Sequence, residues 1–423
     1  MSSIDHRLLP SSATVDADGN LSIGGVAVRD MASHFNTPLF IYDESHLRAR
    51  CREAVAAFGA DRVIYATKAF LCKAMAKLAD EEGVLLDVAT GGEFHVTLSA
   101  GVPGNRCVMH GNNKSMDELR MAITNNIRHI VVDSFDELER LETLHAEGLA
   151  APRVQLRITP GVHVNTHDYV STGQDDSKFG FNLSNGDAHR AIEQARASQA
   201  VQLVGIHCHI GSNVLAIENF EDASKVMVDL FMSTGLEELT LGGGLGVAYT
   251  EKDNAPTMQE WADVLKRAAA SLPSTARVYV EPGRSIVAAA GITVYEVGTV
   301  KKIDGIRTYI AVDGGMSDNM RPALYESEYE VFDPERTTAD RTDHARIVGK
   351  HCESGDILVF DAPVAPDVKV GDLLVTPVTG AYGYSMANNY NKVTRPAVVF
   401  VADGAANIVV RRETLDDLTR LDV

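Results

Sequence analysis

The sequence lacks the features that would tie it to an oxidising compartment, a membrane or a nucleic acid. Its five cysteines are widely scattered without CxxC spacing, which predicts reduced thiols in a cytoplasm rather than disulfides or a zinc site. No apolar run approaches the roughly 18 residues of a membrane span, and the N-terminal MSSIDHRLLP lacks the apolar core of a signal peptide. The formal charge of −19 disfavours nucleic-acid and anionic-membrane partners, which would require a basic patch.

The remaining composition is that of a globular protein with more than one core. Apolar residues make up 45% of the chain and charged residues 23%, and we find no internal repeat, low-complexity tract or flexible linker. A chain of 423 residues can bury two cores, so two domains are the natural expectation.

Eight short apolar segments, most of them separated by helical patterns, predict a (β/α)₈ barrel. A doubly wound sheet is the alternative, but it would not need eight nearly equivalent strands. One intervening helix begins with a capping box at Ser134 and Glu137. We expect the strands at residues 62–67, 84–88, 106–110, 129–133, 153–158, 203–210, 237–242 and 277–281.

Polar residues stand at the end of every predicted barrel strand. In a barrel these ends converge on the carboxyl-terminal face, where such enzymes place their chemistry. One or two polar strand ends would be uninformative, whereas eight of eight indicate a site. The residues are Lys68, Asp87 with Glu93, His110-Gly111-Asn112, Asp133, Arg157, His207 through Ser212, Gly242-Gly243-Gly244, and Glu281-Pro282-Gly283-Arg284.

After residue 285 the helical periodicity largely disappears and an all-β domain, sandwich-like or barrel-like, is predicted. Because residues 10–44 also have β character, we expect the N-terminal segment to join it. The expected domains are therefore a cofactor-binding barrel over 45–285 and a β domain formed by 1–44 with 286–423. Its strands are expected at 292–300, 307–312, 329–332, 345–348, 357–360, 373–375, 397–401 and 408–411.

Lys68 lies where a strand hands over to a predicted helix, whose apolar positions include Leu71 and Met75. An ammonium among apolar neighbours must find a partner, lose its proton or be used covalently. Lysines that bind aldehyde cofactors occupy such settings. The alternative is a strand-end lysine that extends into solvent.

Two motifs near the end of the barrel suit an anionic cofactor. The LGGGLG segment at 241–246 follows a strand and fails the GxGxxG test, but its backbone could cradle a phosphate or simply form a tight loop. In the EPGR turn, Glu281 could keep a pyridine nitrogen protonated, as an electron-sink cofactor requires. An ordinary ion pair between Glu281 and Arg284 is the alternative.

His207 and His209 alternate along a strand and share one face. They could ligate a metal, but no acidic or thiol partner stands at metal-site spacing, so we expect no metal centre. A flat imidazole stacked on an aromatic cofactor, with Ser212 on its phosphate, fits better.

Three segments of the β domain carry further candidates. Cys352 could donate a proton, if an irregular turn presents it together with Glu353; a buried inert cysteine is the alternative. Arg321 and Tyr325 could grip a carboxylate. Tyr382, which stands between glycines, suits close ligand approach, although these loops could also be plain surface. In the barrel, the polar loop at 159–181 is a candidate substrate-contacting segment.

With these residues in view, the chain resembles the diaminopimelate decarboxylase family of alanine-racemase-like (fold type III) pyridoxal-phosphate decarboxylases. The resemblance covers nearly the whole chain. Single motifs recur in ornithine and arginine decarboxylases, whereas the combination of STGQDDSKFGF with CESGD and RPALY is specific to a much narrower set of proteins. The motifs are, in order, YATKAF, STGQDDSKFGF, HCHIGSN, LGGGLG, EPGR, DGGMSDNMRPALY, HCESGDIL and GAYGYSMANNYN.

The resemblance implies pyridoxal 5′-phosphate as cofactor, held covalently by Lys68, with Glu281 facing the pyridine nitrogen and His209 stacked on the ring. Cys352 would return a proton to the substrate carbon. The other implied cofactor contacts are Ser212, Gly243, Gly244, Gly283, Arg284 and Tyr382. The implied substrate contacts are Arg284, Arg321, Tyr325 and Tyr382, with Glu353 on the distal ammonium.

The implied reaction is decarboxylation of meso-2,6-diaminopimelate at its D-centre to L-lysine, the last step of lysine biosynthesis. The resemblance also implies a homodimer in which the partner chain supplies the CESGD loop. Alternatives are a related decarboxylase of D-lysine, D-ornithine or a carrier-bound amino acid, an amino-acid racemase, and a non-catalytic regulator on the same fold. Arg284 and Arg321 favour a second substrate carboxylate, and a regulator would be expected to lose Lys68 or Cys352.

Overall fold

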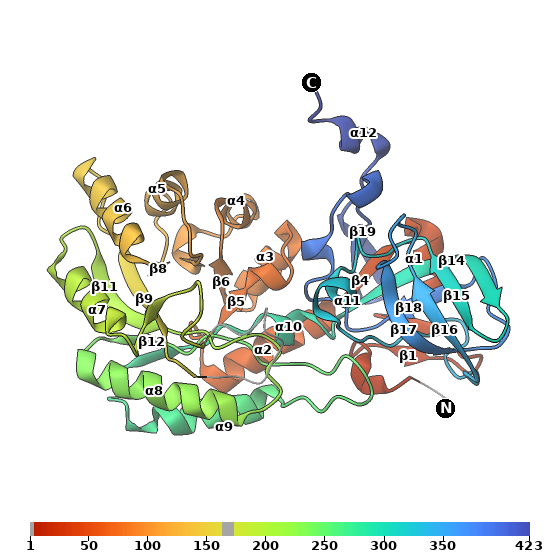
Figure 1. Ribbon diagram of the computed structural model, residues 1–423, viewed down its shortest axis with the longest axis horizontal. Coiled ribbons are helices and arrows are strands. Elements are labelled where there is room, and N and C mark those ends of the chain that lie inside the picture. Colours follow the sequence, from red (N-terminus) through yellow and green to blue (C-terminus); the bar gives the residue numbers. More distant parts are fainter. Residues whose placement is uncertain (1–3, 163–172) are drawn as a thin grey trace. The chain divides into compact units, whose positions relative to one another are not determined.

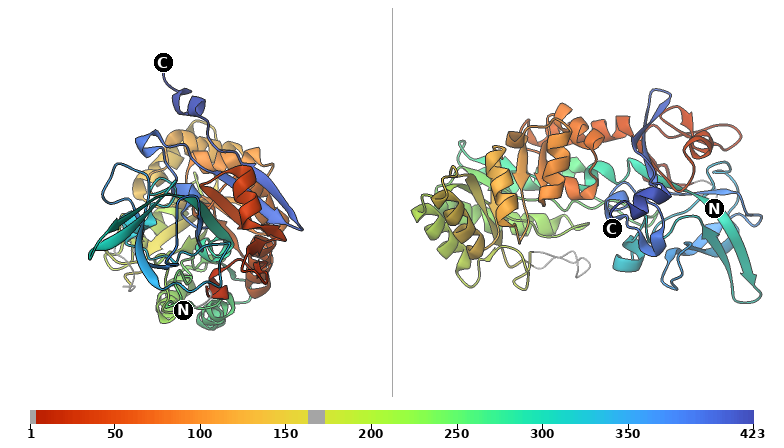
Figure 2. Two further views of the ribbon diagram at one scale, coloured as in Figure 1. Left: turned by 90° about the vertical axis from the view of Figure 1, so that its right-hand side faces the viewer. Right: turned by 90° about the horizontal axis from the view of Figure 1, so that it is seen from above.

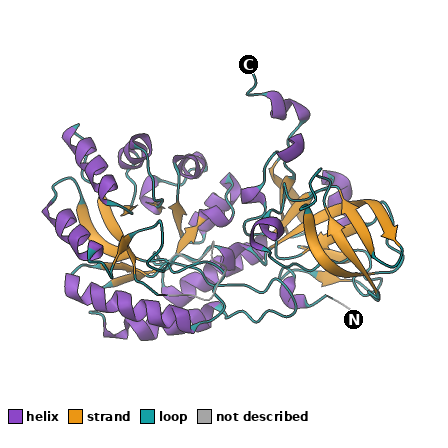
Figure 3. Cartoon of the chain, in the orientation of Figure 1, coloured by secondary structure: helices purple, strands orange, loops and turns teal. Residues whose placement is uncertain are grey.

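The computed structural model describes residues 4–162 and 173–423, which form two compact units. The barrel unit comprises Cys51–Gly246 and Ala255–Ser285. The β unit comprises Met1–Arg50, Val247–Asn254 and Ile286–Val423. Figure 3 shows helices and strands mixed in the first unit and mostly strands in the second. Within the described residues, no helix is long and apolar enough to cross a membrane.

Eight parallel strands form the barrel in the order β13-β12-β11-β9-β8-β7-β6-β5. A parallel bridge between Val63 and Val280 joins the first strand to the last, so all eight predicted strands and the barrel are confirmed. The strands are β5 (Ile64–Ala66), β6 (Leu85–Val88), β7 (Cys107–Met109), β8 (His129–Val132), β9 (Arg153–Thr159), β11 (Gln202–His207), β12 (Glu238–Thr240) and β13 (Arg277–Tyr279); the short β10 (Phe181–Asn182) pairs with β9.

Helices surround these strands (Figure 1). The strands β5 to β8 are buried along their whole length, as expected for a parallel sheet covered by helices. Trp261 of α9 packs edge-on against Phe220 of α8 and anchors that pair of helices. The helices are α3 (Lys73–Glu81), α4 (Gly91–Ser99), α5 (Met116–Thr124), α6 (Phe135–Ala146), α7 (Asp187–Ala197), α8 (Glu218–Thr234) and α9 (Met258–Ala268), with α2 (Glu44–Phe58) continuing from the β unit.

The β unit is built on an eight-stranded sheet, seen from a second direction in Figure 2. Its long strand β14 (Gly291–Ile303) pairs with β4 (Leu39–Asp43), β15 (Arg307–Val312) and β18 (Leu373–Thr376). Because β4 lies between β14 and β19, the N-terminal segment joins this sheet as predicted. The other strands of this sheet are β16 (Asp343–Val348), β17 (Ile357–Val364), β19 (Ala397–Ala402) and β20 (Ala405–Val410).

Smaller elements complete the β unit. The strands β1 (Thr14–Val15), β2 (Leu21–Ile23) and β3 (Val26–Ala27) form a separate three-stranded sheet. The helices are α1 (Val28–Phe35), α11 (Arg321–Tyr325) and α12 (Leu415–Thr419), and the short α10 (Arg284–Val287) links the barrel unit to the β unit.

Three local predictions were wrong. The segment 329–332 forms only a bridge between Phe332 and Val375, because Pro334 has no N–H with which to extend the ladder. Leu71 precedes α3, which begins only at Lys73. The capping box before α6 is half formed. Ser134 accepts from the backbone of Glu137, whereas the Glu137 carboxylate turns inward to Lys114, 2.8 Å away.

Candidate active site

Lys68 lies in a 3₁₀ turn, Thr67–Ala69, directly after β5. Its side chain is 45% exposed, and Nζ lies 3.6 Å from Oδ2 of the buried Asp87 at the end of β6. The chain is tightly packed here, because a Cβ added to Gly283 would lie 2.9 Å from the Cβ of Ala66. The amine is thus reachable from the carboxyl-terminal face of the barrel while its backbone is fixed against the EPGR turn.

Glu281 is buried between two histidines. Nε2 of His110 lies 2.9 Å from Oε1, and Nε2 of His207 lies 2.8 Å from Oε2. Burial alone would raise the pKa of this carboxyl group, but His110 and His207 outweigh it and hold the pKa well below its usual range. Glu281 is therefore a carboxylate at neutral pH, and its partners are these histidines rather than the Arg284 considered from the sequence.

His110, His207 and Glu281 also have the composition of a metal site, which the spacing of the sequence did not indicate. Each nitrogen lies at hydrogen-bond distance from its carboxylate oxygen. Ligands about 2.0–2.1 Å from a tetrahedral zinc ion are expected to lie more than 3 Å apart. The spacing therefore favours ion pairs over a metal centre, and the pair between His207 and Glu281 is also a hydrogen bond.

The glycine-rich loop after β12 lies against its neighbours. A Cβ on Gly243 would lie 1.9 Å from the carbonyl oxygen of Glu281, and one on Gly244 would lie 2.2 Å from that of Gly211. The glycines are required where these strand-end loops meet. Arg284 donates from Nη2 to Oγ of Ser212 at 2.8 Å, so a hydroxyl and a guanidinium stand together beside them.

His209 follows β11 and has a neutral ring. Burial first, and then the positive charges of Lys68 and Arg157, lower its pKa well below the usual value. The backbone N–H of Gly243 donates to its Nδ1 at 3.3 Å. A flat, neutral imidazole so held can stack on an aromatic ring.

These residues of the barrel unit fit pyridoxal phosphate. The group needs an amine for its aldehyde, an ionised carboxylate for its ring nitrogen and donors for its phosphate. Lys68 supplies the amine and Glu281 the buried carboxylate. Ser212 and Arg284 supply side-chain donors beside the close-packed glycines 243, 244 and 283.

In the β unit, α11 carries Arg321 and Tyr325. Arg321 is buried, its Nη1 donates to the hydroxyl of Tyr329, and its guanidinium lies 4.2 Å from the centre of the Tyr249 ring. Its Nε has no hydrogen-bond partner within the described residues. A buried guanidinium held by aromatic rings rather than by a carboxylate is suited to receive one from a ligand.

Cys352 and Glu353 are exposed on an irregular turn, as their joint use requires. Asp356 fixes this turn, since its carboxylate accepts from the backbone N–H groups of Met316 at 2.6 Å and His351 at 2.8 Å. Cys352 is exposed, whereas the four other cysteines are buried. The alternative considered from the sequence, a buried and inert cysteine, is therefore excluded for Cys352. Glu353 lines a cavity of about 540 Å³ together with Pro322 and Ala323 of α11.

Tyr382 has a left-handed backbone, with φ of 57°. The glycines beside it are needed for packing, because a Cβ at either position would meet a backbone carbonyl oxygen. A Cβ on Gly380 would lie 1.9 Å from the carbonyl oxygen of Val287, and one on Gly383 would lie 2.6 Å from that of Thr379.

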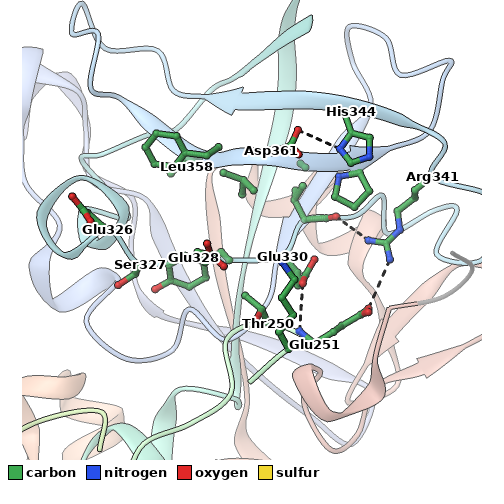
Figure 4. A pocket seen from close by; sticks show the side chains of 17 residues that line it. Thr250, Glu251, Glu326, Ser327, Glu328, Glu330, Arg341, His344, Leu358 and Asp361 are labelled. Carbon is green, nitrogen blue, oxygen red and sulfur yellow. Dashed lines mark hydrogen bonds and ion pairs between the residues drawn. The ribbon is translucent and has the colours of Figure 1, made fainter. Parts of the chain in front are cut away.

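A second cavity in the β unit, of about 1030 Å³, is lined by none of the candidate residues (Figure 4). Its wall is acidic along residues 326–330. Arg341 lies 3.9 Å from Glu251, and His344 lies 3.2 Å from Asp361. Arg341 and His344 are thus each paired with a carboxylate.

Asp318 is a buried acid that follows Ser317, whose hydroxyl contacts His351 beside the Cys352 turn, and burial raises the pKa of Asp318 to about 7. The unfolded chain loses this proton near pH 4, so the free energy of unfolding falls as the pH rises from about 4 to about 7. The upper limit is about 4 kcal/mol at roughly 1.4 kcal/mol per pH unit. We expect Asp318→Asn to raise the Tm at pH 8 by a few degrees and to change it little at pH 4.

Thermal unfolding at both pH values measures this effect. Asparagine keeps an oxygen for the N–H of Gly315, which donates to Oδ2 at 2.9 Å. Asp304→Asn, at an exposed turn, is the control and should leave the pH dependence of the Tm unchanged. A wild-type Tm that does not fall between pH 4 and pH 8 would contradict the buried acid.

The structure adds residues whose roles the sequence did not reveal. Asp87, His110 and Arg157 were noticed only as polar strand ends, and His207 only as a neighbour of His209. Arg157 lies 3.7 Å from Asp133 and 4.3 Å from the centre of the Phe179 ring. Part of the candidate loop at 159–181 lies outside the described residues.

The comparisons with known proteins agree with this chemistry. Residues 44–288 match the family model of the pyridoxal-dependent decarboxylase, pyridoxal binding domain. The chain is 47% identical to diaminopimelate decarboxylase of Bacillus subtilis, over 96% of this chain and 95% of that protein. It is 45% identical to the Corynebacterium efficiens enzyme of the same name, over 98% and 94%. The structure of diaminopimelate decarboxylase from M. jannaschii with L-lysine superposes with a TM-score of 0.89 at 32% identity, covering 98% of each chain.

Proposed function

Because the chain belongs to the diaminopimelate decarboxylase family of pyridoxal-dependent decarboxylases, we propose that it converts meso-2,6-diaminopimelate to L-lysine and CO₂. Pyridoxal 5′-phosphate is its cofactor. The observation that carries the proposal is that Lys68 and the ionised Glu281 follow the paired first and last strands of the barrel on one face. A relative that binds L-lysine supports the identity of the product.

The bound cofactor supplies an aldehyde that takes up amines and a ring that accepts the electron pair left by departing CO₂. Lys68 would hold the aldehyde carbon. Glu281 would keep a negative charge toward the ring nitrogen, and the ring of His209 would stack on the cofactor ring. Ser212, the glycines 243, 244 and 283, Arg284 and Tyr382 would hold the phosphate.

Recognition of the distal end of the substrate selects the reacting end. Arg284, Arg321, Tyr325 and Tyr382 hold the distal carboxylate, and Glu353 holds the distal ammonium. With that end fixed, the D-configured carbon is presented for reaction. Cys352 then donates a proton to this carbon. A substrate without the distal carboxylate leaves Arg321 buried without its anion, which costs binding free energy.

We further propose a homodimer in which the Cys352 turn of one chain serves the barrel of the other. The supporting observation is an incompletely covered apolar surface around that turn, formed by Leu324, Phe360 and Tyr390, all exposed. Such a patch on a globular unit is typical of an interface. We place the enzyme in the cytoplasm, which the five free cysteines favour.

A substrate comparison tests the proposed reaction. With pyridoxal phosphate present, we expect CO₂ release from meso-diaminopimelate and at least about 10³-fold lower kcat/KM for D-lysine and D-ornithine, which lack the distal carboxylate. Turnover of D-lysine but not of diaminopimelate would keep the fold and cofactor and reject the substrate. Inversion of the substrate without CO₂ would indicate a racemase, and no turnover of any kind a regulator.

A further inference from the structure

A line of alternating charges runs from Lys68 across the barrel mouth to Glu281. Asp87 stands next to Lys68, with its Oδ2 3.6 Å from Nζ. His110 comes next, with Nε2 4.0 Å from Oδ1 of Asp87 and 2.9 Å from Oε1 of Glu281. The last member is His207, whose Nε2 lies 2.8 Å from Oε2, the other carboxylate oxygen of Glu281. Except for Lys68, every member is at least 93% buried.

Asp87 is the member that most needs a positive neighbour. Within the described residues, neither of its side-chain oxygens accepts a hydrogen bond. A buried carboxylate without donors is costly unless cations stand close to it. The only two within 4.0 Å in the described chain are Lys68 and His110. When Lys68 is bound covalently and no longer offers a free ammonium, His110 is the cation that remains.

The two histidines on Glu281 differ in their surroundings. Burial lowers the pKa of His110, but Asp87 and Glu281 outweigh it and the net pKa is raised. His207 is paired with Glu281 alone, and burial, His110 and Arg157 lower its pKa. Its Nδ1 has no partner within the described residues, which fits a neutral ring with its proton on Nε2. The centres of the His110 and His207 rings lie 4.9 Å apart in an edge-to-face arrangement. A positive charge on His207 would therefore be repelled by the positive charge on His110.

We propose that His110 is a positioning residue that stands as an imidazolium between Asp87 and Glu281. With neutral His207 it holds the Glu281 carboxylate ionised and in one orientation toward the cofactor ring. The inference rests on the proposed function in that it takes Glu281 to face that ring. Because both oxygens of Glu281 are engaged, the carboxylate cannot rotate without breaking a buried contact.

The charge state of His110 can be measured without cofactor or substrate. In cofactor-free protein with ¹⁵N-labelled histidines, we expect the His110 ring to remain doubly protonated at pH values where an ordinary histidine has already lost its proton, because Asp87 and Glu281 raise its pKa. The His207 ring should be neutral at the same pH. His110→Gln and His207→Gln assign the signals. A His110 ring that titrates near pH 6.5, or is neutral throughout, would overturn the proposal.

Asp87→Asn provides a second variant if His110→Gln does not fold. It removes one of the two carboxylates while preserving the shape of the side chain, so the pKa of His110 should fall. An unchanged pKa would show that Asp87 does not support the charge. Equimolar zinc should leave both rings unchanged, and a zinc-dependent shift of both would replace the ion pairs with a metal site.

Steady-state kinetics separate positioning from general stability. We expect His110→Gln to lower kcat by roughly 10- to 100-fold with little change in KM, as for residues that orient a reacting group through a contact. The matched control is His129→Gln. His129 is equally buried and lies 2.9 Å from buried Glu238, but at the opposite ends of the strands. Equal kcat losses in the two variants would reduce His110 to a packing residue.

The two proposals can fail independently. If the wild-type enzyme does not decarboxylate diaminopimelate but His110 is doubly protonated, the substrate is wrong and the charge arrangement stands. If the wild-type enzyme turns over and His110 is neutral, the function stands and the proposed role of His110 is wrong.

Discussion

The variant Lys68→Ala is expected to lose the visible absorbance of the covalently held cofactor and at least about 10³-fold of kcat/KM. Lys68 is the amine at the barrel mouth beside Asp87, and alanine cannot bond to the aldehyde carbon. The loss should not be one of folding, because the side chain is nearly half exposed and alanine leaves no large cavity. Absorbance and CO₂ release on the same sample measure both effects.

Lys73→Ala is the control for this experiment. Lys73 begins α3 five residues later and is exposed, so its loss should change neither the absorbance nor the rate. Retained covalent binding in Lys68→Ala would assign the cofactor to another lysine. Such a result would leave the fold intact and remove the central residue of the proposed site.

The second large effect is expected from mixing two inactive proteins. Cys352→Ala should lose about 10²- to 10⁴-fold of kcat, since a proton donor contributes that much. If the partner chain supplies Cys352, dimers containing one Lys68→Ala chain and one Cys352→Ala chain have one complete site. Random exchange of subunits should then restore about a quarter of wild-type activity, because half the dimers carry one site of two.

Each variant mixed with itself is the control and should remain inactive. Subunit exchange can be followed by giving the two variants different tags and isolating dimers that carry both tags before the assay. Heterodimers that form without activity would show that Cys352 and Lys68 act within one chain. A protein that stays monomeric at assay concentration would reject the homodimer itself.

The barrel was predictable because its signals are local. A buried parallel strand is a short apolar run, and each was followed by a polar residue at the position where the strand ends. The strand prediction at 329–332 failed because Tyr329 and Val331 are apolar and buried without being paired in a ladder. Burial and strand pairing give the same sequence pattern, and a proline two residues later decided between them.

The arrangement around Glu281 was not predictable from spacing. His110, His207 and Glu281 are separated by dozens of residues and meet because β7, β11 and β13 end at the same face. The sequence placed all three on that face but could not show which side chains touch. For the same reason, the Glu281–Arg284 pair suggested by their proximity in sequence is replaced by more distant partners.

The closure of the barrel also determines when the site comes into existence. The N–H of Ile64 donates to the carbonyl of Val280 at 2.8 Å, and that of Ala66 to Pro282 at 3.1 Å. The amine and its carboxylate thus come from the first and last strands, more than 200 residues apart. During synthesis Lys68 emerges early, but the site cannot assemble until residues 277–284 have left the ribosome, because contacts between distant segments form late. Binding of the cofactor therefore indicates that the whole barrel has folded.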